Sequence, residues 1–202
     1  MKKWLPLIII VALILIIGGW IASVNNRLVH LDENVMAQWG NVESSYQRRA
    51  DLIPNIVNTA KGYAEFEQET LIAVTEARSK ATAMTVDPSK ATPEQMAQFQ
   101  EAQAGLSSAL SRMLLTFERY PDLKANENFK ELINELERTE NRINVERNRY
   151  NETLRIYNPE TRKFPTKIVA SMLGFEPKPY FEAEAGSESA PQVEFDFGKD
   201  KK

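Results

Sequence analysis

The first 24 residues constrain this chain more than any other part. From Trp4 to Val24 the sequence contains no charged residue, and Leu, Ile and Val dominate. As a helix these 21 residues rise about 1.5 Å each and span ~30 Å, the thickness of the hydrocarbon core of a bilayer. Pro6 falls in the first turn, where a missing N–H costs little. We therefore expect a transmembrane anchor at residues 4–24, in contact with the lipid bilayer.

A cleaved signal peptide is the alternative interpretation, because Lys2 and Lys3 supply a basic start. The apolar run is longer than the hydrophobic region of a usual signal peptide, and no A-x-A site follows it, so an uncleaved anchor is favoured. Lys2, Lys3 and the amino terminus outweigh Arg27 beyond the segment, which by the positive-inside rule places the N-terminus in the cytoplasm. We expect a single-pass protein of the bacterial cytoplasmic (inner) membrane, with its body outside.

The composition argues against several classes of function. A formal net charge of −3 over 202 residues gives no general attraction to nucleic acid. Cys is absent, which excludes disulfides and thiolate chemistry, and His30 is the single histidine. One histidine excludes paired-His zinc motifs and a ferritin-like di-iron site, which needs a Glu-x-x-His from each of two helices. We expect no catalytic residues, no cofactor and no metal.

Apolar residues recur at three- and four-residue spacing along three stretches, as in the seams of packed helices. The first seam is Leu28, Leu31, Val35, Trp39, Val42 and Tyr46, the second is Met96, Phe99, Gln103, Leu106, Leu110, Met113 and Phe117, and the third is Phe129, Leu132, Leu136, Glu140, Ile143, Arg147, Tyr150, Leu154 and Tyr157. The first stripe continues through Ile56, Val57, Ala60 and Tyr63 to Val74, Ala77, Ala81 and Met84. We expect the three seams side by side around one elongated core.

Turn and capping residues predict where these helices begin and end. Pro54 clashes with the carbonyl of Ala50, so we expect a kink or a helix restart at residues 51–53. The loop at residues 85–95 ends in Thr92, Pro93 and Gln95, which predict an N-cap, a first-turn proline and a capping box.

The last long helix is expected to start near Asn126, after a stop at Tyr120–Asp122, and to end at Asn158–Pro159. A short amphipathic helix is predicted at Thr166–Leu173, with Gly174 following its last turn.

Charged residues interrupt these apolar seams. Arg48, Arg49 and Asp51 precede Pro54, while Glu140 and Arg147 occupy core positions of the third seam. Because a buried lone charge is costly, we expect partners from other helices. Arg48 or Arg49 should reach Glu140 or another acid of its helix, with Asp51 helping to compensate. An active site built from these residues is the weaker interpretation, since interhelical ion networks commonly fix the register of helices.

The C-terminal region from residue 182 is acidic, small and polar, a composition typical of disorder. One island, residues 191–197, alternates Val193, Phe195 and Phe197 with polar residues. We expect this island to dock on its own bundle or on a neighbouring protomer, because exposed apolar segments of this length tend to pair. A wholly flexible tail stays open as the alternative.

Several runs resemble the LemA family: WGNVESSYQRRADLIPNIV, KGYAEFE, EAR, YPDLKANENF, ELERTENRI, ERNRYNETLRIYN, FPTKIVASMLGF and PYF. The resemblance extends over residues 25–197 and implies a membrane anchor followed by an elongated antiparallel helical bundle. It implies no enzymatic activity. The family's signature residues correspond to Arg48, Arg49, Asp51, Leu52, Pro54, Asn55, Glu140, Asn141, Arg142, Arg147, Tyr150 and Asn151.

Together these observations predict an all-α chain with an N-terminal flank (1–3), a transmembrane helix (4–24), an elongated antiparallel bundle of three to four long helices with a short C-terminal helix (25–181), and an acidic tail (182–202). The first functional hypothesis is a membrane-anchored scaffold that forms homo-oligomers or contacts other envelope proteins. The second is an accessory adaptor or sensor subunit of a membrane signalling or proteolytic system. An enzyme that uses the Arg/Glu/Asn cluster is the third.

Overall fold

The computed structural model describes residues 4–62 and 67–182. Within these ranges the chain forms six helices and no strand: α1 (Leu5–Lys61), α2 (Gln68–Ala83), α3 (Pro93–Phe117), α4 (Pro121–Ala125), α5 (Glu127–Arg162) and α6 (Thr166–Leu173). The expected all-α fold with a short C-terminal helix is confirmed. The apolar island with Val193, Phe195 and Phe197 lies outside the described residues.

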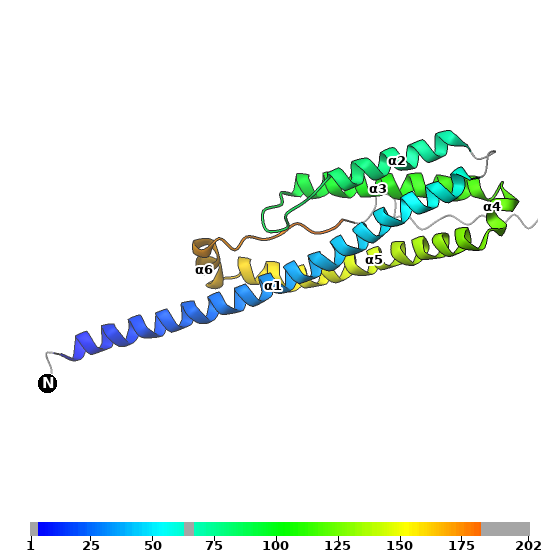
Figure 1. Ribbon diagram of the computed structural model, residues 1–202. Helices are drawn as coiled ribbons and strands as arrows, with labels where there is room; N and C mark the ends of the chain where they lie inside the picture. Colours follow the sequence, from blue (N-terminus) through cyan, green and yellow to red (C-terminus); the bar gives the residue numbers. More distant parts are fainter. Residues whose placement is uncertain (1–3, 63–66, 183–202) are drawn as a thin grey trace, which may run out of the picture.

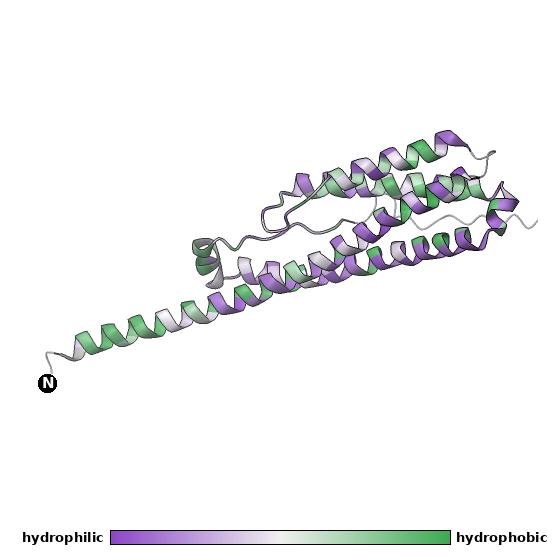
Figure 2. Cartoon of the chain, in the orientation of Figure 1, coloured by the Kyte–Doolittle hydropathy of each residue, from purple (hydrophilic) through white to green (hydrophobic). Residues whose placement is uncertain are grey.

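α1 is one uninterrupted helix of 57 residues, which makes it ~85 Å long. Its first part projects beyond the other helices (Figure 1) and is mainly hydrophobic (Figure 2). Every side chain from Pro6 to Ser23 is exposed, Val24 is half-buried and Leu28 is fully buried. By length and composition the projecting part is able to cross a membrane. The same helix therefore forms both the apolar segment and one wall of the bundle.

The four long helices run antiparallel to their neighbours in two layers (Figure 1). α1 lies mainly against α5, and α2 lies mainly against α3. The side chains between the layers form two hydrophobic clusters. The anchor-side cluster is built around Trp39, Phe99, Tyr150 and Phe181. The far cluster includes Ile56, Leu110, Phe117, Leu123 and Phe129.

The helical seams occupy this core. All seven residues of the second seam are buried, from Met96 to Phe117. In the first seam Leu31 is partly buried and packs against the anchor-side cluster. In the third seam Leu132 is partly buried and packs against the far cluster. The predicted elongated antiparallel bundle is therefore confirmed.

The capping residues act as their sequence pattern predicts. Thr92 accepts a hydrogen bond from the backbone N–H of Gln95, and the Gln95 side chain accepts one from the backbone N–H of Thr92. Pro93 is the first residue of α3. Gly174 follows α6 with a φ of 79°, in the left-handed region that glycine adopts without a Cβ penalty.

Pro54 does not interrupt α1, so of the expected kink or helix restart the restart is wrong, and the kink stays a prediction. The proline has no N–H for the carbonyl of Ala50, four residues earlier. Nε of Arg78, on α2, donates to that carbonyl oxygen at 2.7 Å and takes the place of the missing backbone donor. Ile53 and Ile56, on either side of Pro54, are buried in the far cluster and fix this part of α1 to the bundle.

Two other boundaries differ from the prediction. α5 passes through Pro159 and ends at Arg162, and its last turn is held by one tertiary and one local hydrogen bond. Asn158 donates to the carbonyl of Lys178, and the hydroxyl of Thr161 donates to the carbonyl of Asn158, both at 2.9 Å. The first apolar stripe is not one helix, since α1 ends at Lys61 and α2 begins at Gln68.

Removing Phe117 should test the bundle core. Its ring lies 4.4 Å from the Phe129 ring, centroid to centroid, and is buried in the far cluster. Phe117→Ala should lower the free energy of unfolding by ~3–5 kcal/mol, as measured by urea denaturation. Leu115→Ala is the control, because Leu115 on the same helix is 72% exposed. Equal stability of the two variants would contradict this packing.

The bond from Arg78 to the Ala50 carbonyl should depend on Pro54. Arg78→Ala should cost about 1.5–3 kcal/mol of unfolding free energy, as for a lost hydrogen bond to a charged group. In a Pro54→Ala background the new N–H bonds this carbonyl, so the same change should cost much less. A double-mutant cycle measures the difference, with Lys80→Ala, exposed on the same helix, as the control. Equal costs in both backgrounds would show that Arg78 does not replace the proline's missing donor.

Candidate functional site

A polar layer separates the two hydrophobic clusters, and Arg49 of α1 is at its centre. Arg49 follows Tyr46 of the anchor-side cluster and precedes Ile53 of the far cluster. Gln103 of α3 and Glu140 of α5 occupy the equivalent level on their helices. Because the Arg49 side chain is only 1% exposed, its charge needs partners from the protein; Nη1 and Nη2 have them, whereas Nε has no hydrogen-bond partner within the described residues.

The guanidinium of Arg49 donates to three side chains from two helices. Nη1 donates to Oε1 and Oε2 of Glu140 at 2.9 and 3.2 Å, and to Oγ of Ser107 at 2.7 Å. Nη2 donates to the side-chain oxygen of Gln103. The guanidinium carbon also lies 5.2 Å from the centre of the Tyr46 ring, within the range of a cation–π interaction. One arginine thus joins α1 to α3 and α5.

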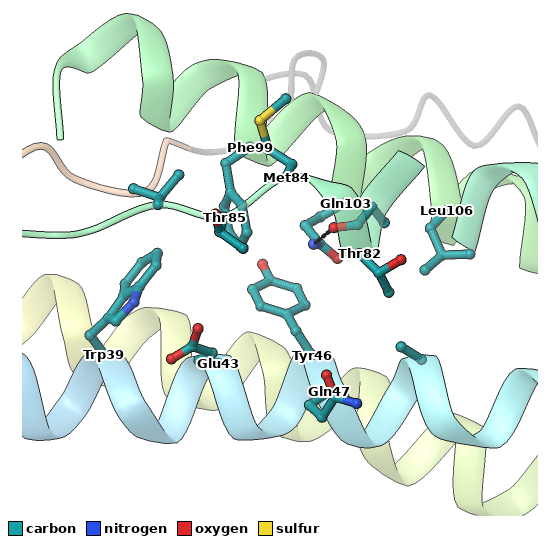
Figure 3. A pocket seen from close by; sticks show the side chains of 13 residues that line it. Trp39, Glu43, Tyr46, Gln47, Thr82, Met84, Thr85, Phe99, Gln103 and Leu106 are labelled. Atoms are coloured by element: carbon teal, nitrogen blue, oxygen red, sulfur yellow. Dashed lines mark hydrogen bonds between the residues drawn. The ribbon is translucent and has the colours of Figure 1, made fainter. Parts of the chain in front are cut away.

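Gln103 extends the layer to the second helix pair. Its Nε2 donates to the backbone carbonyl of Ala81 on α2 at 3.1 Å, while its Oε1 accepts from Arg49. Figure 3 shows Gln103 across from Tyr46 of α1, at a small cavity of about 90 Å³ that Trp39 also lines. Four helices therefore meet through two side chains. Sequence analysis missed Gln103, although a glutamine in a core position of the second seam was a usable signal.

Arg48 forms a separate pair on the surface. Its Nη2 lies 2.5 Å from Oε1 of Glu135, with side chains 59% and 26% exposed. Asp51 takes no part in either pair, contrary to expectation. It is exposed and accepts a hydrogen bond from Gln47, one turn earlier, at 2.8 Å. Asn55 is also exposed, and its carbonyl accepts from the hydroxyl of Thr59.

Arg147 and Asn151 hold the segment after α6, whereas we expected Arg147 to have a partner on another helix. Nη2 of Arg147 donates to the carbonyl of Glu182 at 3.1 Å. The Asn151 amide donates to the carbonyl of Phe181 at 2.8 Å and accepts from its N–H at 2.9 Å. Asn158, seven residues further along the same helix face, bonds the N–H and carbonyl of Lys178 in the same way. Asparagine side chains on α5 thus bind the extended backbone of residues 175–182.

Side chains of this extended segment fill the bundle. The Phe181 ring stacks on Trp39 with centroids 5.8 Å apart and meets the edge of Tyr150 at 5.5 Å. Nζ of Lys178, almost fully buried, forms an ion pair with Asp32 of α1 at 2.8 Å. The segment is therefore part of the core and ties α5 to α1.

Two buried tyrosines on α5 have perturbed ionisation. The hydroxyl of Tyr150 has no hydrogen-bond partner within the described residues, and burial raises the pKa of this group. Burial also raises the pKa of Tyr157, and the nearby carboxylate of Asp32 adds to the effect. Both tyrosines therefore stay neutral at ordinary pH and do not act as bases.

A hollow of about 560 Å³ lies beside the polar layer, between α3 and α5. Its polar lining includes Gln100, Glu101, Ser107, Asn144 and Arg147. Among the described residues, no group of three or more His, Cys, Asp or Glu side chains is placed to hold a metal ion. Ser107 accepts from Arg49, which is a hydrogen-bond donor and not a base, so this serine lacks the partner of an activated nucleophile. The hydrogen bonds of the polar layer therefore join the helices to one another.

A family model described as the LemA family matches residues 38–195. The chain belongs to the LemA family. The match begins after the apolar part of α1 and includes the polar layer, the asparagines that bind residues 175–182 and the apolar island only as far as residue 195.

The chain is also similar to curated relatives of two kinds, magnetosome proteins and a LemA protein. Magnetosome protein MamQ 2 of Paramagnetospirillum magneticum is 26% identical over 178 residues, covering 78% of this chain and 64% of that protein. Protein LemA of Metamycoplasma hominis is 27% identical over 148 residues, covering 73% and 64%. Magnetosome protein MamQ of Magnetospirillum gryphiswaldense is 24% identical over 192 residues, covering 83% and 69%. The chain thus spans less than two thirds of the length of the first two relatives.

Breaking the buried pair should cost far more than breaking the surface pair. Glu140→Ala leaves the charge of Arg49 without a counter-charge inside the bundle, so unfolding free energy should fall by about 3 kcal/mol. Glu135→Ala removes the partner of exposed Arg48 and should cost ~0–1 kcal/mol. Urea denaturation measures both. Coupling between Arg49 and Glu140 in a double-mutant cycle no larger than that between Arg48 and Glu135 would contradict the central role of this pair.

Proposed function

We propose that this LemA-family protein is a membrane-anchored helical scaffold of the bacterial envelope that self-associates and contacts other envelope proteins without catalysing a reaction. One observation carries the proposal. α1 runs without a break from the exposed apolar segment to the polar layer and on into the far cluster. A bundle built on the anchoring helix itself is held at a set distance from the membrane, as a scaffold requires.

Ion pairs and hydrogen bonds along α1 support a rigid projection. Arg27 pairs with Glu160 at 3.0 Å near the anchor, and Gln38 donates to Glu146 at 2.7 Å further along. Arg49 bonds Glu140 beyond them. These contacts join α1 to α5 at three levels, so the two helices move as one body.

The absence of a catalytic set in the described hollows is consistent with a structural role. The hollow beside the polar layer is lined by side chains that already bond one another, such as Arg49 and Ser107. The names of the magnetosome relatives refer to a cellular structure and not to a reaction. Both points support a scaffold over an enzyme.

We place the N-terminus in the cytoplasm and the bundle outside the cytoplasmic (inner) membrane, with a single crossing. Lys2 and Lys3 precede the apolar segment. In the ten residues that follow it, Arg27 is the only Lys or Arg, and His30 is the only histidine. This asymmetry supports the orientation by the positive-inside rule.

Self-association should depend on the apolar island at residues 191–197. The full chain in mild detergent should give a discrete homo-oligomer by native mass spectrometry. Deleting residues 191–202 should reduce it to smaller species, because Val193, Phe195 and Phe197 supply the contact. Deleting only residues 198–202 is the matched control and should leave the assembly intact. A monomeric full chain, or equal assembly of both truncations, would contradict this part of the proposal.

An accessory adaptor or sensor subunit is the second candidate, and the continuity of α1 is compatible with it as well. A tilt or rotation of the membrane segment reaches the polar layer through one helix, with no hinge at residue 24 to absorb it. A monomer in the mass measurement supports this candidate over the scaffold.

A further inference from the structure

α6 and the residue pair before it leave an apolar face uncovered. Ile168 is 55% exposed and Met172 76%, and because these positions are four residues apart in α6 they share one side of the helix; Phe164, in the turn just before α6, is 83% exposed. Leu173 is 48% exposed beside them. The opposite side of α6, with Val169 and its neighbours Thr166 and Ala170, is buried against the bundle. α6 is therefore fixed in place by one face and presents large apolar side chains with the other.

Ion pairs place this face at the end of the apolar part of α1. Glu160 binds Arg27 of α1 at 3.0 Å and also binds Lys163, which immediately precedes Phe164. Arg27 is only three residues beyond Val24, a rise of ~5 Å along the helix. α6 packs against both α1 and α5, and Figure 1 shows it at the end of the bundle from which the apolar segment projects. Figure 2 shows hydrophobic residues on both.

Basic residues accompany the exposed apolar ones. Arg162, Lys163 and Lys167 are exposed, and no acidic residue occurs from Thr161 to Phe175. An exposed apolar stripe flanked by Lys and Arg is the composition of helices that lie in the interface of a bilayer, where acyl chains take the apolar side chains and anionic headgroups attract the basic ones.

We propose that α6 is a second membrane contact, an interfacial helix that inserts Phe164, Ile168, Met172 and Leu173 into the bilayer that α1 crosses. Because this exposed face of α6 is continuous with the apolar segment of α1, we take lipid to be what covers it. A side chain at this level lies at the height where the bilayer begins, whereas Leu115 on α3, equally exposed, lies far from it. This inference rests on the proposed membrane anchorage and adds a fixed orientation of the bundle on the membrane surface.

The chain contains no Cys, so single cysteines can be labelled cleanly. Ile168→Cys and Met172→Cys carry a nitroxide in the full chain, reconstituted in vesicles of phosphatidylcholine with phosphatidylglycerol. Power saturation compares collisions with oxygen, which concentrates in lipid, and with a polar nickel complex, which stays in water. The ratio of oxygen to nickel collisions should be several-fold higher at both positions than at Leu115→Cys, the matched exposed control. Random orientation in the vesicles does not affect this ratio.

Ile14→Cys separates failure of this inference from failure of the anchor. A lipid-like ratio at Ile14 with water-like ratios at Ile168 and Met172 overturns only the α6 contact. A water-like ratio at Ile14 overturns the anchorage as well. Spin–spin broadening at Ile168 that disappears on dilution with unlabelled protein assigns the face to a second copy and overturns the proposal. Protection of the label at Ile168 that is lost when residues 183–202 are deleted assigns the face to that segment of the chain, and this result also overturns the proposal.

Lipid composition tests the basic residues. Replacing phosphatidylglycerol by phosphatidylcholine alone should reduce the oxygen-to-nickel ratio at Ile168, and Lys163→Gln/Lys167→Gln should give the same loss in the mixed vesicles. An unchanged ratio in both arms would show that charge takes no part in the contact and would overturn this element of the proposal.

Discussion

The buried guanidinium of Arg49 determines how the rest of the bundle is arranged. A charge that is 1% exposed is tolerated only where an acid and several acceptors meet it, and Glu140, Ser107 and Gln103 do so from two helices. Sliding α5 or α3 by one turn would move those acceptors about 5.4 Å away and leave the charge unpaired. The apolar side chains on either side of the polar layer can pack in more than one helix register, but the hydrogen bonds of the polar layer form in only one. The hydrophobic clusters supply most of the driving force for folding, and Arg49 selects one alignment of helices from those they permit.

The parts of the structure that follow from local rules could be predicted from the sequence. The heptad seams located the core, and Thr92 with Gln95 located the start of α3, because both patterns depend on residues within a few turns of each other. The errors have a common cause. The helices continue through Pro54 and Pro159 where partners from elsewhere in the chain bond neighbouring residues: Arg78 bonds the Ala50 carbonyl, and Lys178 bonds Asn158. No local pattern contains that information. The expectation of a compensating role for Asp51 failed for the same reason, since its neighbours across the bundle were unknown.

The extended segment after α6 is bound as a peptide would be, through its backbone. Asn151 and Asn158 each pair with both the N–H and the carbonyl of one residue, Phe181 and Lys178. Such bonds depend little on the bound side chains, so affinity for a particular segment comes from what fills the neighbouring pockets. Here the ring of Phe181 completes the aromatic cluster around Trp39. The bundle without this segment would expose both the asparagine row and an aromatic cavity.

The pairing of α1 with α5 has a consequence for the order of synthesis. Their contacts join residues 87 to 133 positions apart, from Arg48–Glu135 to Arg27–Glu160. The ribosome adds the 91 residues between Arg49 and Glu140 in roughly 5 to 20 seconds. During that interval the apolar stripe and the arginine of α1 lack their α5 partners, while α2 and α3, which are adjacent in the chain, can already pair. The nascent protein therefore exposes most unpaired apolar surface before α5 emerges, and the proposed anchor would limit encounters between such chains to the two dimensions of the bilayer.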